Sequence, residues 1–309
     1  MEAVVTVPVQ REKVRFVSGD QHCAAWHYPG TNGACVVMAA GMAVTKEPGT
    51  DRFAKRFQDA GFSVLAFDYR HFGESGGEPR QVLRVRQHVA DWAAALTCAA
   101  ALPGVDRARL AIWGFSSSGG LVIEVAAQHP GVVAAVAQTP LTDGQAATRN
   151  ALRYQRPLAM LRLTGRGMLD ALGGLVGRRP LLVALDGPPG TVAVLTTPDA
   201  QDSVAALDPD GRHAGWQRAV AARSALRMGF YRPGRHAARV VVPLLVVVCD
   251  QDQSALAGPA LRAVGRAPRG ELVRLPGGHY APFLDEHERA VEAELSFLRR
   301  HLLEGSPVS

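Results

Sequence analysis

A serine at a turn of small residues, between two apolar segments, is the first candidate for chemistry. Residues 110–113 are apolar, the turn reads Gly-Phe-Ser-Ser-Ser-Gly-Gly, and residues 121–128 suit a helix. A strand that turns sharply into a helix holds Ser116 at its apex, and the positions two before and two after must be small because their backbones crowd each other. Gly114 and Ser118 meet this demand, although Ser118 departs from the strict G-x-S-x-G pattern. Ser116 is therefore the predicted nucleophile.

A serine hydroxyl is a poor nucleophile at neutral pH and needs a general base within hydrogen-bond reach. His279 is the predicted base, because it follows a strand-like segment in the loop Pro-Gly-Gly-His-Tyr, whose glycines let the imidazole reach the serine. His213 and His236 lie in a different part of the chain and are weaker rivals.

Two aspartates of one loop compete for the role of the carboxylate that orients the imidazole. Asp250 and Asp252 both follow the apolar run 240–249 and precede His279, which is the chain order that this kind of turn requires. Asp252 is favoured because it lies further past the strand, where a side chain can turn toward the active face. Asp250 stays open as the alternative acid, and Asp143 is a third, weaker candidate.

Two backbone amides are predicted to hold the oxyanion that forms when the serine attacks a carbonyl. One is the amide of Ser117, directly after the nucleophile, and the other comes from the loop after an early strand. That loop follows residues 34–40, so Met42 is the predicted second donor, and Gly41 allows the tight backbone path. The helix that begins beside Ser116 adds the positive end of its dipole.

These residues need a scaffold, and the chain supplies an alternation of apolar strands with helical segments. Runs that are apolar throughout indicate strands buried on both faces of a parallel sheet. The sequence therefore predicts an α/β fold with a mostly parallel central sheet and helices on both faces, and a site at the carboxyl edge of that sheet. Strands are expected at 12–18, 22–28, 34–40, 63–67, 109–113, 131–137, 240–249 and 271–275, and helices at 51–60, 81–102, 117–128, 256–266 and 286–301.

Residues 144–240 interrupt this alternation and are too many for a plain loop in a compact domain. Leucines at helical spacing and a Gly/Pro-rich centre at 186–190 indicate an inserted, mainly helical cap. We therefore expect a core built from residues 1–143 and 241–309, with the cap at 144–240 roofing the Ser116 pocket.

Several motifs match a known superfamily over nearly the full length of the chain. They are the oxyanion segment at 37–42, a loop at 67–77 like D-Y-R-x-x-G-x-S-x-G, the turn at 113–120, and the acid and base positions at 250–252 and 278–279. On these residues the chain resembles an α/β-hydrolase, and more narrowly the capped bacterial branch of dienelactone-hydrolase-like and Xaa-Pro-peptidase-like (S15-type) serine hydrolases. One departure is Ala40, which stands where a histidine often precedes the glycine of the oxyanion loop.

The resemblance and the predicted triad together favour one reaction and leave three alternatives open. The leading hypothesis is a serine hydrolase that cleaves a carboxylic ester through an acyl-enzyme on Ser116. The alternatives are a thioesterase or acyltransferase that uses the same triad, a peptidase or amidase, and a non-catalytic binding protein on a hydrolase fold. The expected partner is a small acyl substrate, and homo-oligomerisation stays open.

Composition and charge exclude several other classes of protein. The net charge is +6, and residues 144–240 hold 14 Arg, no Lys and 6 Asp, but the arginines are scattered and no nucleic-acid-binding motif occurs. The glycines at 73–77 lack dinucleotide-binding spacing and the four cysteines lack metal-ligand spacing, so no cofactor and no metal are expected. Residues 1–4 do not begin a secretory signal, and no apolar run reaches membrane-spanning length. We therefore expect a cytoplasmic protein with no membrane partner.

Overall fold

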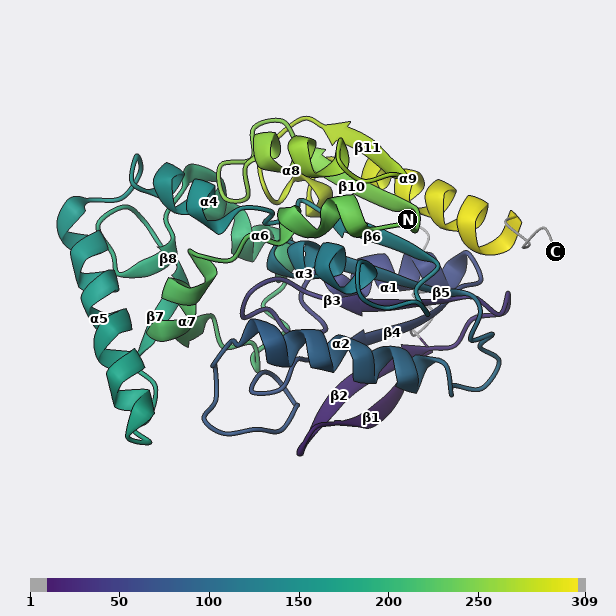
Figure 1. Cartoon of the computed structure of the whole chain (residues 1–309), viewed down its shortest axis with the longest axis horizontal. Helices are drawn as coiled ribbons and strands as arrows, with labels where there is room; N and C mark the ends of the chain where they lie inside the picture. Colours follow the sequence, from purple (N-terminus) through teal and green to yellow (C-terminus); the bar gives the residue numbers. More distant parts are fainter. Residues whose placement is uncertain (1–9, 305–309) are drawn as a thin grey trace, which may run out of the picture.

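An eight-stranded sheet lies at the centre of the molecule (Figure 1). The computed structural model describes residues 10–304, so the expectation about residues 1–4 and the outer limits of the expected core lie outside the described residues. The strand order is β1-β2-β4-β3-β5-β6-β10-β11, and all pairings from β4 to β11 are parallel. The strands are β1 Glu12–Ser18, β2 Gln21–Tyr28, β3 Cys35–Ala39, β4 Ser63–Phe67, β5 Leu110–Phe115, β6 Ala134–Gln138, β10 Leu244–Cys249 and β11 Gly270–Leu275.

Burial explains why the central strands are apolar throughout. Every residue of β3, β4, β5, β6 and β10 is buried, because helices cover both faces of the sheet. Helices α2, α3 and α8 pack on one face, and α1 and α9 pack on the other (Figure 1). The predicted α/β class with a mostly parallel sheet is confirmed. The helices of the core are α1 Thr50–Asp59, α2 Val85–Ala99, α3 Ser117–Ala126, α8 Ala257–Val264 and α9 His287–Arg299, with the short 3-10 helix η3 Ala281–Phe283 before α9 and the π-helical segment η4 Arg300–Glu304 after it.

The strand order creates a topological switch point beside β3, where successive connections run in opposite directions along the sheet. The chain leaves β3 through α1 toward β4, and it leaves β4 through α2 in the opposite direction, past β3, to reach β5. Right-handed crossovers of opposite direction place α1 and α2 on opposite faces. The carboxyl ends of β3 and β5 are therefore left open, and such a switch point is where open α/β sheets bind ligands.

Two predicted boundaries are wrong by several residues, for reasons of local geometry. The helix expected from residue 81 begins at Val85, because Gln81 has a positive φ of 61° and its side chain donates to the carbonyls of Gln217 and Ala219. The strand expected from residue 240 begins at Leu244, directly after Pro243, which has no N–H to donate to a sheet.

Residues 144–240 leave the sheet after β6 and return to it before β10. Most of them lie together beside the core (Figure 1), whereas residues 233–239 pack on the core helices α3 and α8. They contain more helix than strand, but they also form a three-stranded sheet, β8-β7-β9, that the sequence analysis did not predict. Its strands are only three to five residues long, which is too short for a periodic pattern to mark them. The elements are α4 Gly144–Ala151, α5 Pro157–Leu175, β7 Leu182–Asp186, β8 Ala193–Leu195, η1 Pro198–Asp202, α6 Ser203–Leu207, β9 Ala219–Ala221, α7 Ala222–Met228 and η2 Pro233–Arg239.

Within residues 10–304, none of the helices combines the length and the apolar character that crossing a membrane requires.

Candidate active site

Ser116 occupies the sharp turn between β5 and α3. Its φ of 58° and ψ of −117° lie in a region that side chains rarely adopt, at a cost of roughly 1–3 kcal/mol. The turn is tight because a Cβ on Gly114 would lie 2.4 Å from the carbonyl oxygen of Ser118, so only glycine fits there. The strain keeps the Ser116 hydroxyl above the carboxyl end of the sheet.

The structure brings Ser116, His279 and Asp252 into one hydrogen-bonded line. His279 Nε2 lies 3.0 Å from Ser116 Oγ, and His279 Nδ1 lies 2.7 Å from Asp252 Oδ2. The other carboxylate oxygen of Asp252 accepts from the Ala255 amide at 2.6 Å, which fixes the carboxylate. Each of the three residues follows the carboxyl end of a parallel strand, namely β5, β10 or β11.

The electrostatics of this line suit a general base. The His279 side chain is only 1% exposed, and burial alone lowers the pKa of an imidazole. The neighbouring carboxylates of Asp252 and Asp199 outweigh burial and raise the pKa of His279 above its ordinary value. The Nδ1 bond to Asp252 sets the tautomer, which leaves Nε2 free to accept the proton of Ser116.

The remaining candidates for acid and base lie elsewhere. Asp250, the alternative acid, is exposed and pairs with Arg274 at 2.8 Å. Asp143 caps α4 by accepting from the Ala146 amide at 3.1 Å. The ring of His236 lies 3.9 Å from Glu124.

The two residues predicted to supply amides to the oxyanion, Met42 and Ser117, line the cavity together with Ser116. Ser117 is the first residue of α3, so its N–H has no acceptor within the helix. Met42 follows β3, and its N–H has no hydrogen-bond acceptor within the described part of the chain. A Cβ on Gly41 would lie 3.2 Å from the Cβ of Ser116, so glycine lets this loop approach the serine closely.

A buried chain of hydrogen bonds supports the start of the Met42 loop. Trp92 Nε1 donates to the Tyr69 hydroxyl at 2.8 Å, and that hydroxyl lies 2.7 Å from Ser118 Oγ. Ser118 in turn donates to the carbonyl oxygen of Ala40. Ser118, which departs from the G-x-S-x-G pattern, therefore hydrogen-bonds to Ala40, which stands where a histidine is usual.

Asp199 is a site residue that the sequence analysis missed. It belongs to η1, between β6 and β10, yet its Oδ2 accepts from the amides of Gln253 at 2.7 Å and His279 at 3.2 Å. Its Oδ1 accepts from the Ser254 hydroxyl at 2.9 Å. Burial by itself raises the pKa of Asp199. The positive charge of His279 and the hydrogen bond from the Gln253 N–H outweigh it, so the pKa of Asp199 is lowered. No motif marks this residue, because only the tertiary fold brings η1 to the loops of the acid and the base.

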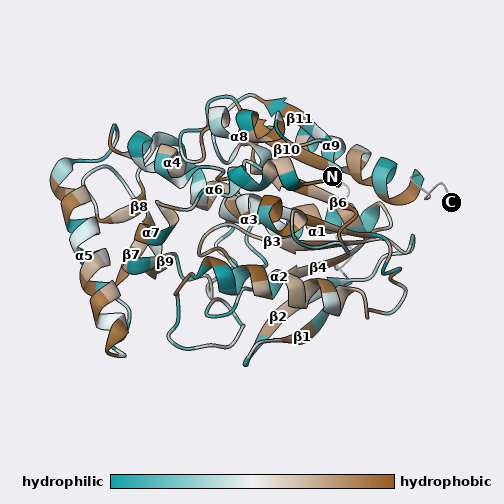
Figure 2. Cartoon of the chain, in the orientation of Figure 1, coloured by the Kyte–Doolittle hydropathy of each residue, from teal (hydrophilic) through white to brown (hydrophobic). Residues whose placement is uncertain are grey.

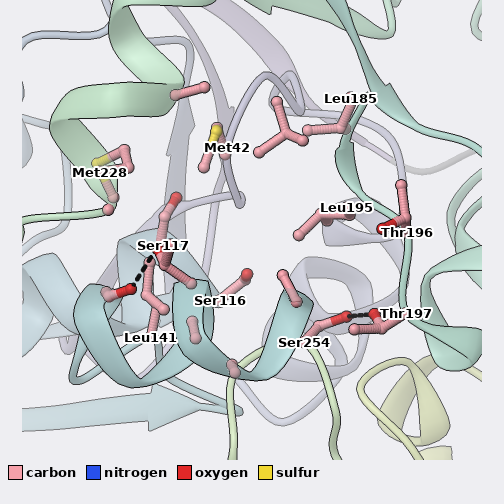
Figure 3. Close-up of a pocket in the computed structure, with 18 of the residues that line it drawn as sticks. Met42, Ser116, Ser117, Leu141, Leu185, Leu195, Thr196, Thr197, Met228 and Ser254 are labelled. Carbon is pink, nitrogen blue, oxygen red and sulfur yellow. Dashed lines mark hydrogen bonds between the residues drawn. The ribbon is translucent and has the colours of Figure 1, made fainter. Parts of the chain in front are cut away.

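A cavity of about 500 Å³ opens above Ser116, within the size range of small-molecule sites (Figure 3). Its wall is mainly apolar, with Met42 and Leu141 from the core and Leu185, Leu195 and Met228 from the segment 144–240. Among the described residues that line it, none is Asp or Glu. The site thus combines a polar floor with an apolar wall, which suits a reactive carbonyl that carries an apolar group.

No group of three or more His, Cys, Asp or Glu side chains within residues 10–304 is arranged to hold a metal ion.

The chain matches the family described as serine aminopeptidase S33 over residues 30–285, which is most of its length. The chain belongs to this family. The dienelactone-hydrolase-like and S15-type branch expected from the sequence is not the branch that matches. The motifs at 67–77 and 113–120 build a turn and a supporting loop that α/β-hydrolases share, so they indicate the superfamily but do not separate its branches.

Relatives of this S33 member carry names of hydrolases and transferases. It is 36% identical to the quorum-quenching protein AidA of Acinetobacter baumannii over 298 residues, 95% of this chain and 96% of AidA. It is 30% identical to a thiohydrolase of Eupenicillium brefeldianum over 188 residues, 60% of this chain and 55% of that protein. The polyketide transferase GrgF of a Penicillium species is 30% identical over 168 residues, 54% of each chain.

A solved structure confirms the α/β-hydrolase fold of this S33 member. The crystal structure of the α/β-hydrolase GrgF from Penicillium sp. sh18 superposes with a TM-score of 0.79 at 24% identity, over 95% of this chain and 99% of that chain. The family and the named relatives support an enzyme that carries out hydrolysis or acyl transfer.

Proposed function

We propose that this S33 member is a serine hydrolase that cleaves a carboxylic ester through an acyl-enzyme on Ser116. The observation that carries the proposal is the hydrogen-bonded line from Asp252 through His279 to Ser116, which ends at the floor of an apolar cavity. A binding protein on the same fold would not require this line, nor the strained backbone of Ser116.

In the proposed reaction, His279 Nε2 takes the proton of the Ser116 hydroxyl as Oγ attacks the carbonyl carbon. The carbonyl oxygen becomes an oxyanion, which the amides of Met42 and Ser117 stabilise together with the dipole of α3. The protonated His279 then donates its proton to the leaving alcohol, and the acyl group stays on Oγ. A water molecule, deprotonated by His279, releases the acid and restores the serine. Asp252 remains ionised and stabilises the imidazolium in both steps.

The cavity supports an acyl group that is apolar and of small or medium size. Its wall is apolar, and no carboxylate among the described lining residues is available for an ammonium group. An aminopeptidase has to bind the free amino terminus of its substrate, so the wall argues against the activity in the family description. The A. baumannii relative is named a quorum-quenching protein, so quorum quenching is a candidate role of this chain. The substrate panel below therefore includes acylated lactones, which are cyclic esters with an apolar tail.

We further propose that residues 144–240 form a cap that selects the acyl group. Met160 and Leu163 of α5, Leu185 of β7 and Leu195 of β8 face the cavity that opens above Ser116. The cap is also tied to the core, since Trp216 Nε1 donates to the Ala43 carbonyl at 2.8 Å.

Acyl transfer is the second candidate, and the thiohydrolase and polyketide transferase relatives favour it. The same acyl-enzyme forms from a thioester, and it transfers its acyl group to whichever nucleophile reaches the carbonyl. Water gives hydrolysis, and an alcohol gives transfer. The two activities differ in the acceptor and share every proposed role of Ser116, His279 and Asp252.

Labelling and a substrate panel test the proposal together. A fluorophosphonate probe should react with the wild-type protein at Ser116, as read by peptide mass spectrometry, and should not react with Ser116→Ala. The panel holds aryl esters of rising chain length, acyl thioesters, N-acyl homoserine lactones and amino-acid arylamides, with and without an added alcohol. Labelling at Ser117 or Ser118, or turnover that survives Ser116→Ala, would refute the assignment of the nucleophile.

A further inference from the structure

Helix α5 carries an apolar stripe on its outer side, where no element of residues 10–304 covers it. Leu161 is 68% exposed and Leu175 is 83% exposed, values that are unusual for leucines of a long helix. The spacing of the exposed residues places them on one face, opposite the face that packs on α7. Figure 2 shows hydrophobic residues along α5 at the outer edge of the molecule. The exposed apolar residues of the helix are Leu158, Leu161, Met168, Leu169, Leu172 and Leu175.

Arginines lie on α5 and in the chain segments just before and after it, and they have no ion-pair partner within residues 10–304. Two of them, Arg162 and Arg166, lie on α5 itself, beside the stripe. The only acid between residues 151 and 182 is Asp170, which is buried and pairs with Arg223 at 3.6 Å. The outer face of α5 is therefore cationic as well as apolar. The exposed, unpaired arginines are Arg153, Arg156, Arg162, Arg166, Arg178 and Arg179.

The stripe is continuous with the cavity above Ser116. Met168 is 59% exposed on the stripe side of α5 and also lines the cavity, as do Met160 and Leu163 from the inner side of the same helix. Phe230, which is 75% exposed, stands at the cavity as well. A surface that covers the stripe therefore meets the entrance of the cavity.

We propose that the outer face of α5 docks on an anionic lipid bilayer. Leucines on one face enter the interfacial region, and guanidinium groups bind the lipid phosphates, which is how amphipathic helices hold proteins at membrane surfaces. Such peripheral contact needs no spanning segment, so the absence of one, on which we based the expectation of no membrane partner, does not oppose it.

A second copy of the chain fits this face less well. A two-fold interface is self-complementary, so contact through α5 brings the six arginines of one copy next to those of the other. The face offers no carboxylate to neutralise them. Lipid phosphates supply the negative charge that neutralises the arginines, so an anionic bilayer fits this face better than a second copy of the chain does.

The consequence for catalysis rests on the proposed function. An acyl substrate that partitions into lipid would enter the cavity at Met168 directly from the bilayer, without crossing water. The docking itself requires only α5 and is independent of Ser116.

The test measures binding to vesicles with and without anionic lipid. Wild-type protein should co-sediment with vesicles of phosphatidylcholine and phosphatidylglycerol, and much less with phosphatidylcholine alone. Raising NaCl from about 0.1 M to about 0.5 M should weaken binding, because salt screens the arginines. The triple variant Leu161→Gln, Leu169→Gln, Leu172→Gln should lower the partition coefficient at least about tenfold, since three apolar side chains no longer leave water. None of these leucines lines the cavity.

Matched variants separate docking from other effects. Arg162→Gln with Arg166→Gln should reduce binding and its dependence on salt. The control, Val17→Gln with Val241→Gln, alters exposed apolar residues outside α5 and should bind as the wild type does. The triple variant should hydrolyse a short, water-soluble ester at the wild-type rate, and Ser116→Ala should bind vesicles normally. The proposal is overturned if the wild type does not bind anionic vesicles, if the triple variant binds equally well, or if light scattering shows a dimer that only the triple variant loses.

Discussion

Replacing Asp199 tests how a residue outside the predicted triad governs the base. Asp199→Asn removes the charge but keeps an oxygen where Oδ2 accepts from the amides of Gln253, Ser254 and His279. The asparagine amide can donate to the Ser254 hydroxyl in place of the present bond. The geometry of the two loops should survive, and only the electrostatic effect on His279 should change.

The sign of the expected change follows from the pKa of His279. The base must be neutral to accept the proton of Ser116, so kcat/KM rises with pH through the pKa of His279 in the free enzyme. The carboxylate of Asp199 helps to raise that pKa. Asp199→Asn should therefore move the rise to lower pH, while the rate on the plateau changes by less than about tenfold.

Asp199→Ala should behave differently, because it removes the acceptor as well as the charge. Each buried N–H left without an acceptor destabilises a fold by roughly 1–3 kcal/mol, so the loss of three bonds should lower the free energy of unfolding by on the order of 3 kcal/mol. A displacement of about 1 Å in the loops of the acid and the base should lower kcat by roughly a hundredfold.

The assay is kcat/KM for a soluble aryl ester between about pH 5 and 9, together with urea unfolding of each variant. Asp202→Asn is the control, since Asp202 is an exposed carboxylate of the same η1 turn. If the profile of Asp199→Asn superimposes on that of the wild type and Asp199→Ala keeps full activity, then Asp199 has no role in positioning or tuning His279.

Four further outcomes follow from the site. Ser116→Ala and His279→Ala should each lower kcat by about a millionfold, as in subtilisin-type triads, with unchanged thermal unfolding of the serine variant as the check on folding. Asp252→Asn should lower kcat by roughly ten-thousandfold, because the amide favours the wrong tautomer of His279. Asp250→Asn, two residues before Asp252 in the same loop and paired with Arg274, should change kcat by less than about threefold, and the reverse order of severity would assign the acid to Asp250. Leu163→Phe should shorten the preferred acyl chain across an ester series while a small activated ester is still cleaved, and an unchanged preference would place selectivity outside the cap.

The parts that the sequence predicted well are those in which local pattern and tertiary environment agree. β3, β5 and β10 are apolar throughout because both of their faces are covered, so their runs are visible without a structure. The order of Ser116, Asp252 and His279 follows from where those strands end, and in the structure the three side chains form one hydrogen-bonded line.

The parts that the sequence missed depend on contacts between distant segments. Asp199 is indistinguishable from any loop aspartate until η1 lies against the loop at Gln253. The strands of the small sheet β8-β7-β9 are too short to show an alternating hydrophobic pattern. Hydrogen bonding between distant parts of residues 144–240 defines them, rather than the β-propensity of their own residues. The stripe on α5 is a third example, because leucines at helical spacing predict a buried face, and only the fold shows which side is left uncovered.

The bridge from Ser118 to Ala40 has a consequence for how such chains are found and redesigned. Two departures from the usual motif, a serine for a glycine and an alanine for a histidine, meet in one hydrogen bond and support a single loop. The bond ends on the main-chain carbonyl of Ala40, so it depends on the hydroxyl of Ser118 and not on which side chain residue 40 carries. A motif search that insists on glycine at the second small position passes over this enzyme. A design that corrects that position by itself removes the hydroxyl on which the neighbouring loop rests.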